Sequence, residues 1–169
     1  MVVCVTMTLK IITADYHNPA HRKALTTLLN EYACDPMGGG HVLEESVLEA
    51  LPDALASTAG AVTFLADDDQ QFIGLLNAFR GFSTFRAKPL LNIHDVYVAP
   101  KFRGIGISHH LLQAAEQHAL ETNCCKMTLE VLSGNTSAQA SYRRFGFHSY
   151  SLDAETGTAL FWEKSLSAN

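Results

Sequence analysis

The segment that most constrains the fold runs from Val98 to Ser108, where an apolar strand pattern gives way to a glycine-rich turn and then to a helical pattern. A helix that begins at such a turn presents backbone N–H groups and the positive end of its dipole, which suits a pyrophosphate. An ordinary tight connection between a strand and a helix has the same pattern. A dinucleotide-binding turn is disfavoured, because this one follows an antiparallel region and His109 stands where the third glycine would be.

The apolar periodicity of the rest of the chain predicts a mixed α/β fold, with helices on the faces of one sheet. Asn18 and Pro19 are typical of a helix start, and a turn at residues 67–70 predicts a β-hairpin. Strands are predicted at residues 8–14, 61–66, 71–82, 90–98, 126–132, 147–152 and 158–166. Helices are predicted at residues 19–35, 105–122 and 135–145. Another helix is predicted to begin near residue 43, and Pro52 is expected to break or restart it.

Composition narrows the function classes. The length of 169 residues suits one domain, and 47% hydrophobic residues are enough for a core. The net charge of −5 and the lack of a basic run disfavour a nucleic-acid partner. No export or membrane segment is recognised and the cysteine spacing favours reduced thiols, so we expect a cytoplasmic protein. Met7 is a second candidate start, so the domain is taken as residues 7–169 and residues 1–6 as a candidate extension.

A second motif lies downstream, where residues 135–147 fit the pattern N-x-x-A-x-x-x-Y-x-x-x-G-F. Together with the glycine-rich turn, it resembles the GNAT superfamily of acetyl-CoA-dependent N-acetyltransferases. The resemblance implies a mostly antiparallel central sheet with a splayed parallel strand pair and about four flanking helices. It also implies acetyl-CoA as the cosubstrate. The sequence itself supports no metal site, because His109 and His110 lack the spacing of two metal-binding histidines on a helix.

The resemblance assigns residues to the acetyl donor. Backbone groups of Val96, Tyr97 and Val98 are the candidates for pantetheine binding, and Asn135, Ala138 and Tyr142 of the second motif are further candidates for binding the coenzyme. Asn135 is equally suited to be a plain helix cap. The family's phosphate turn maps onto Arg103, Gly104, Ile105, Gly106, Ile107 and Ser108, of which Ser108 departs from the family's small apolar residue.

Three residues are candidates for proton transfer. The resemblance implies that Tyr142 protonates the leaving thiolate, although a packing tyrosine would show the same spacing. The family often places a glutamate that acts as the general base on the strand before the turn, and in this chain His94 occupies that position. Glu130, on the adjoining predicted strand, is a second candidate for the base, and solvent is the alternative. Since neighbours in a strand face opposite sides, His94 and Asp95 are not expected to act as a pair.

In the family, the acceptor is recognised by the first helices, their loop and the hairpin before the central strand. We expect a primary amine of a small, cationic acceptor, since the layout is similar to that of polyamine and diamine acetyltransferases and the chain is acidic. Aminoglycosides, amino-acid amines, and protein N-termini or lysines remain alternatives, as does a catalytically silent CoA-binding or regulatory module. The resemblance also predicts a homodimer that pairs through the C-terminal strands. The substrate-binding candidates are Tyr32, Asp35, Phe82, Phe85 and Asp95.

Overall fold

The computed structural model describes residues 8–151, 155 and 157–166, so the candidate extension at residues 1–6 lies outside the described part. The chain divides into two compact units, residues 1–129 and residues 130–169. The elements of the first unit are β1 (Lys10–Thr13), α1 (Pro19–Cys34), α2 (Glu45–Ser57), β2 (Ala61–Asp67), β3 (Phe72–Ser83), β4 (Lys88–Val98), the 3₁₀ turn Pro100–Phe102, α3 (Ile107–Glu121) and β5 (Met127–Leu129). The second unit contains α4 (Thr136–Phe145).

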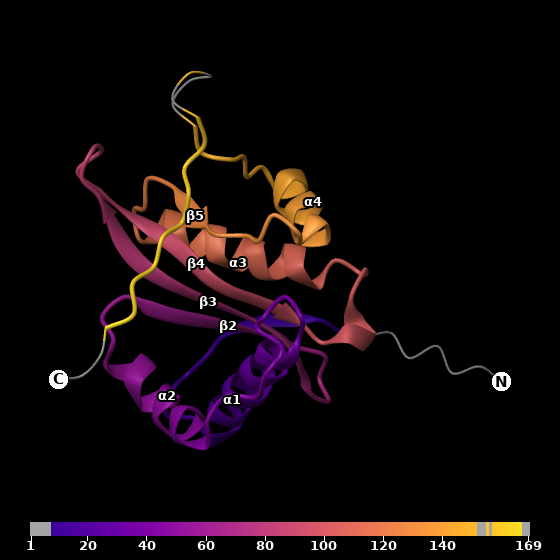
Figure 1. Ribbon diagram of the computed structural model, residues 1–169. Coiled ribbons are helices and arrows are strands. Elements are labelled where there is room, and N and C mark those ends of the chain that lie inside the picture. The colour runs from indigo at the N-terminus through magenta and orange to yellow at the C-terminus, as the bar shows by residue number, and fades with distance from the viewer. Residues whose placement is uncertain (1–7, 152–154, 156, 167–169) are drawn as a thin grey trace. The chain divides into compact units, whose positions relative to one another are not determined.

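The first unit is built on one five-stranded sheet in the order β1-β2-β3-β4-β5. All neighbouring strands are antiparallel except β4 and β5, which are parallel. Helices α1 and α2 lie on one face of this sheet, and α3 lies on the other (Figure 1). The predicted mixed, mostly antiparallel fold with one parallel pair is therefore confirmed.

Local sequence signals explain where α1 and α2 begin and why they stay helical. The side-chain oxygen of Asn18 accepts hydrogen bonds from the backbone N–H groups of Ala20 (2.9 Å) and His21 (3.4 Å), and Pro19 occupies the first helical position. The predicted break at Pro52 is wrong, because α2 continues through it. Pro52 and Leu55 are the buried residues of α2, and their packing offsets the one helical hydrogen bond that proline cannot make.

The core lies on both faces of the sheet. Leu28 of α1 packs with Leu65 of β2, Leu75 of β3 and Tyr97 of β4 on one face. On the other face, α3 presents an apolar stripe with helical spacing, but the helix begins at Ile107, and Ile105, at the predicted start, is exposed. That stripe consists of Ile107, Leu111, Leu112, Ala115 and Ala119.

A β-bulge interrupts the pairing of β3 with β4. Ala78 pairs with Ile93, but Asn77 pairs with Asp95, so His94 is an extra residue on β4. Directly opposed residues share a face of the sheet, and Asn77 and Phe79 share the α1 face with Leu75.

The bulge changes the direction of the side chains that follow it. Asp95 and Tyr97 point to the α1 face with Asn77, whereas Ile93 shares the opposite face with Ala78. The His94 ring lies against the Phe79 ring, with centroids 5.0 Å apart, and therefore also on the α1 face. The expectation that His94 and Asp95 face opposite sides is thus wrong, because strand alternation does not hold across a bulge.

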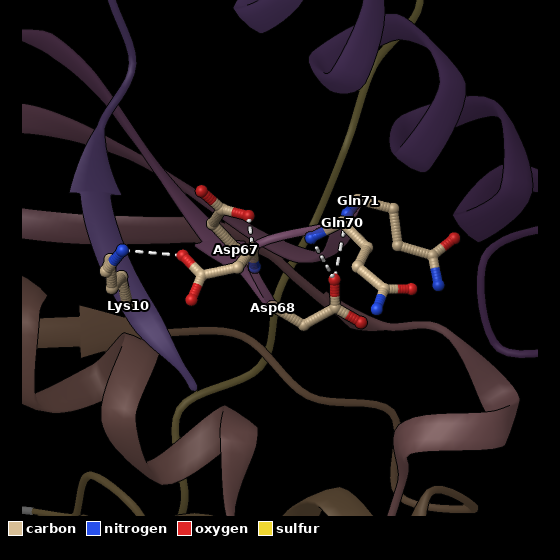
Figure 2. Close-up of polar contacts among 6 residues, drawn as sticks. Lys10, Asp67, Asp68, Gln70 and Gln71 are labelled. Carbon is tan, nitrogen blue, oxygen red and sulfur yellow. Dashed lines mark hydrogen bonds and ion pairs between the residues drawn. The ribbon is translucent and has the colours of Figure 1, made fainter. Parts of the chain in front are cut away.

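The turn between β2 and β3 is held by its own carboxylates (Figure 2). Asp68 Oδ1 accepts hydrogen bonds from the backbone N–H groups of Gln70 (3.0 Å) and Gln71 (2.8 Å), and Asp67 Oδ1 accepts one from Asp69 (2.9 Å). The ammonium group of Lys10 on β1 lies 2.5 Å from Asp69 Oδ1. These contacts fit the predicted solvated hairpin turn.

The second unit departs most from the sequence prediction. The predicted strand at 126–132 is shorter, since β5 ends at Leu129. The predicted strands at 147–152 and 158–166 are also wrong for their described residues, which contain only an isolated antiparallel bridge between Ser151 and Thr158. An apolar run becomes a strand only where another strand accepts its backbone hydrogen bonds, and the side chains of Leu160, Phe161 and Trp162 are exposed instead.

Candidate active site

The glycine-rich turn takes a conformation that only glycine adopts readily. Gly104 has φ of 82°, and Gly106, which caps the start of α3, has φ of 93°. A Cβ atom placed on either glycine would meet no other atom within 4 Å, so the backbone of the turn borders open space. The first N–H groups of α3, at Ile107 and Ser108, have no intrahelical acceptor. This arrangement fits a phosphate-bearing ligand.

The strand that leads into this turn has an edge that β5 covers only in part. The parallel pairing with β5 involves Leu91, Asn92 and Ile93 and ends there. Residues 96–98 of β4 pair with β3 on their other side. The predicted backbone groups of Val96, Tyr97 and Val98 therefore lie beyond the β4–β5 pairing, which is where an extended ligand could add to the sheet edge.

Arg103 of the turn connects three parts of the first unit. Its Nε donates to the carbonyl oxygen of Val98 (2.8 Å), and its Nη2 donates to Asp35 Oδ2 at the end of α1 (2.8 Å). Its guanidinium carbon lies 5.6 Å from the centroid of the Tyr97 ring. A hydrogen bond from the backbone N–H of Met37, together with the bond from Arg103, lowers the pKa of Asp35. Asp35 is therefore a paired carboxylate rather than an isolated attractor of cations.

Two tyrosines stand among carboxylates on the α1 face. The rings of Tyr32 and Tyr97 lie 5.9 Å apart, and the Tyr97 hydroxyl donates to Glu31 Oε2 at 3.3 Å. Burial raises the pKa of Tyr32, and the negative charges of Asp95 and Asp35 raise it further. Burial likewise raises the pKa of Tyr97. The structure thus brings together three of the five predicted acceptor residues, Tyr32, Asp35 and Asp95.

The other two predicted acceptor residues lie elsewhere. Phe82 pairs with Pro89, five residues along β3 from Asn77, which corresponds to about 17 Å of strand. By strand alternation it faces the side opposite Asn77. Phe85 is fully exposed in the turn between β3 and β4. Neither ring joins Tyr32 and Asp95, so the structure does not bring Phe82 and Phe85 together with the other candidates for acceptor binding.

A row of hydrogen-bonded polar side chains behind Asp95 was not predicted from the sequence. Asn77 Nδ2 donates to Asp95 Oδ2 (2.9 Å), and Thr63 Oγ1 donates to Asn77 Oδ1 (2.6 Å). The Tyr16 hydroxyl lies 3.0 Å from Thr63 Oγ1. These residues come from four places in the chain, and neither Thr63 nor Asn77 belongs to a recognisable motif.

The remaining predicted residues belong to the two units as follows. His94 is exposed beside Asp95 in the first unit. Glu130 does not lie on a strand as predicted, because it directly follows the end of β5 and begins the second unit. In that unit, Asn135 caps α4 by accepting a hydrogen bond from Ala138 N–H (3.1 Å), which uses only its carbonyl oxygen. Tyr142 on α4 is half-buried, with its ring 6.0 Å from that of Phe147.

Within the described ranges, no group of three or more His, Cys, Asp and Glu side chains is arranged to bind a metal ion. None of the helices in the described part of the chain has the length and apolar character needed to cross a bilayer.

Known proteins resemble this chain in sequence and in fold. The profile of the acetyltransferase (GNAT) family matches residues 24–147. An aminoglycoside N(6')-acetyltransferase type 1 from Acinetobacter genomosp. 13 is 25% identical over 126 residues, which cover 73% of this chain and 82% of the relative. A thialysine N-epsilon-acetyltransferase from Bos taurus is 31% identical over 65 residues, 38% of each chain. The crystal structure of a probable acetyltransferase, at 26% identity, superposes with a TM-score of 0.75 over 92% of this chain and 99% of its own.

The family match covers the larger, C-terminal part of α1, the whole glycine-rich turn and the α4 motif, which are the segments that carry the residues described above. The chain therefore belongs to the GNAT family and is an acetyl-CoA-dependent N-acetyltransferase.

Proposed function

We propose that this enzyme transfers the acetyl group of acetyl-CoA directly to a primary amine of a small, cationic acceptor. The observation that carries the proposal is the position of Asp95. The bulge at His94 turns the Asp95 carboxylate to the α1 face, beside Tyr32 and two residues along β4 from Tyr97. A carboxylate among tyrosine rings is a suitable partner for an ammonium group.

The donor half of the proposal rests on the turn and on the edge of β4. The N–H groups of Ile107 and Ser108, next to the open backbone of Gly104 and Gly106, would bind the pyrophosphate. The backbone of residues 96–98 would bind pantetheine in the manner of an added strand. A backbone N–H there would also stabilise the charge that develops on the thioester oxygen. Asn135 and Ala138 would contribute from α4, since the cap leaves the amide NH₂ of Asn135 as a donor.

The proton transfers need a base and an acid. His94 is our first candidate for the base, because an imidazole nitrogen can accept a proton and the bulge sets the ring on the same face as Asp95. Glu130 or water is the alternative base. Tyr142 is our candidate for the acid that protonates the thiolate of CoA as it leaves.

The acceptor class is supported by charge and by relatives. Glu31, Asp35 and Asp95 surround Tyr32 and Tyr97, and Arg103 is the counter-ion of Asp35. The relatives named above carry aminoglycoside and thialysine in their names. A small amine acceptor is therefore favoured over a protein N-terminus or a silent CoA-binding role.

We also propose a homodimer that forms through the C-terminal segment. Leu160, Phe161 and Trp162 are exposed, and an exposed apolar run of this kind is typical of an interaction surface. Sedimentation at micromolar concentration should show twice the mass of 18.4 kDa. A monomer alone would contradict the proposal.

The acceptor class is tested by a screen that measures the release of free CoA thiol from acetyl-CoA. The panel pairs each cationic amine, such as a diamine or an amino sugar, with an amine of the same length that carries no second charge. We expect release with the cationic member of each pair. Equal rates for both members would contradict a cationic acceptor, and release with protein N-terminal peptides alone would favour a protein acceptor.

A further inference from the structure

Two buried polar residues lie in the middle of an otherwise apolar sheet. Thr63 on β2 and Asn77 on β3 are 1% and 3% exposed. They oppose each other across the two strands, and Asn77 opposes Asp95 on β4. A row of polar side chains therefore crosses three strands and ends at a half-buried carboxylate.

The hydrogen bonds of this row have one direction. A carboxylate oxygen accepts, so the atom of Asn77 that lies 2.9 Å from Asp95 Oδ2 is its NH₂ group. The Asn77 oxygen is then left to accept from the Thr63 hydroxyl at 2.6 Å. Thr63 has only one proton to donate, so it accepts from the Tyr16 hydroxyl at 3.0 Å. Every donor of the row therefore points toward Asp95, whose side-chain oxygen accepts the last hydrogen bond.

Stability alone does not explain the row. Buried polar groups must be hydrogen-bonded to avoid a penalty, and even satisfied networks are often no more stable than apolar side chains of similar size. On the same face of the sheet, the residues two positions along from Thr63 and Asn77 are Leu65 and Leu75, which are fully buried. An apolar pair would therefore suit positions 63 and 77, whereas the polar pair fixes the orientation of one particular carboxylate.

We propose that Thr63 and Asn77 are positioning residues that hold the Asp95 carboxylate in the orientation in which it binds the ammonium group of the acceptor. The inference deepens the proposed function and rests on it for the identity of the ligand. Tyr16 anchors the outer end of the row. The ionisable groups on this face include Glu31, Tyr32, Asp35, His94, Tyr97 and Arg103, with His21 against Phe72 farther along the sheet.

The kinetic test uses Thr63→Val, which keeps the shape of the side chain and removes its hydroxyl. Loss of one hydrogen bond behind Asp95 should raise KM for a cationic amine by about threefold to tenfold. The value of kcat and the KM for acetyl-CoA should stay within about twofold. Thr63→Ser restores the hydroxyl and should return KM for the amine close to the wild-type value.

The matched control is Ser83→Ala, which removes another buried hydroxyl from β3 at the hairpin end of the strand. It should leave KM for the amine unchanged. The proposal is overturned if Thr63→Val lowers Tm but leaves the kinetic constants unchanged. It is also overturned if Thr63→Val changes kcat, KM for the amine and KM for acetyl-CoA to the same extent and Thr63→Ser does not restore them, because Thr63 would then be merely structural.

A second measurement does not depend on turnover. The side-chain amide NH₂ resonances of Asn77 should shift as Asp95 is protonated in an acid titration, and they should not shift in Asp95→Asn. If no cationic amine is acetylated, the proposed function fails while this titration still decides the positioning role. If the Asn77 resonances do not change when Asp95 is protonated, the proposed positioning role is overturned, whichever acceptor the enzyme acetylates.

Discussion

Arg103 of the phosphate turn is hydrogen-bonded to Asp35 at the end of α1, with 2.8 Å between Nη2 and Oδ2. Asp35 in turn organises the loop that follows it, because its Oδ1 accepts from Met37 N–H and its carbonyl oxygen accepts from Gly38 and Gly40. The candidate donor site and the loop predicted to face the acceptor are therefore joined by one ion pair.

This pair predicts a pH dependence of stability. The pKa of Asp35 is lowered in the folded state, so its contribution is present above the ordinary carboxyl pKa and is lost as the pH falls through the lowered value. Asp35→Asn should therefore reduce the free energy of unfolding by about 1 kcal/mol at pH 7, and the difference from wild type should shrink toward pH 3. Urea unfolding at both pH values measures it.

The control for that experiment is Asp53→Asn. Asp53 also pairs with an arginine, Arg22, but its side chain is 73% exposed and the pair is screened by water. It should change stability less than Asp35→Asn does. A loss for Asp35→Asn that is equally large at pH 3 and pH 7 would show that packing, and not charge, is responsible.

The glycine-rich turn predicts a ligand effect on stability. A ligand that binds only the folded protein adds about 2.7 kcal/mol at a hundredfold excess over Kd, so saturating acetyl-CoA should raise Tm. Gly106→Asp adds a carboxylate where the pyrophosphate would lie and should abolish this rise. Gly40→Asp is matched to it, since Gly40 also has positive φ (77°) and open space at its Cβ, and it should keep the rise. Full CoA affinity in Gly106→Asp would place the phosphates elsewhere.

Tyr142 provides a test of the proposed acid. Tyr142→Phe keeps the ring that contacts Phe147 and removes only the hydroxyl. General-acid catalysis is worth about 10²–10⁴-fold, and because CoA is a good leaving group we expect a loss of kcat near the lower limit. Calorimetry should find CoA affinity unchanged. A kcat within about twofold of wild type, with product release shown not to limit the rate, would make Tyr142 a packing residue.

The parts of the fold that could be predicted from sequence are those that local chemistry decides. The Asn18 cap, the stripe of α3 and the glycines at 104 and 106 each depend on neighbours within a few residues, and all three are found in the structure. The paired motifs on either side of β5 identify the family.

The parts that could not be predicted depend on residues far apart in the chain. The bulge at His94 arises from register with β3, and nothing in the alternation of residues 90–98 reveals it. Thr63, Asn77 and Asp95 are brought together only by strand pairing. The C-terminal apolar run resembles a strand in composition, but a strand also requires a partner edge, which composition does not specify.

We infer that the Asp95 carboxylate makes this GNAT enzyme select a cationic amine. The most direct test compares kcat/KM for a charged amine with kcat/KM for its uncharged analogue. Both are measured by thiol release in wild type and in Asp95→Asn. We predict that wild type prefers the charged amine by at least about tenfold, the effect of roughly 1.4 kcal/mol, and that Asp95→Asn loses this preference while its KM for acetyl-CoA is unchanged. A preference that survives in Asp95→Asn, or one that wild type never shows, would contradict the account.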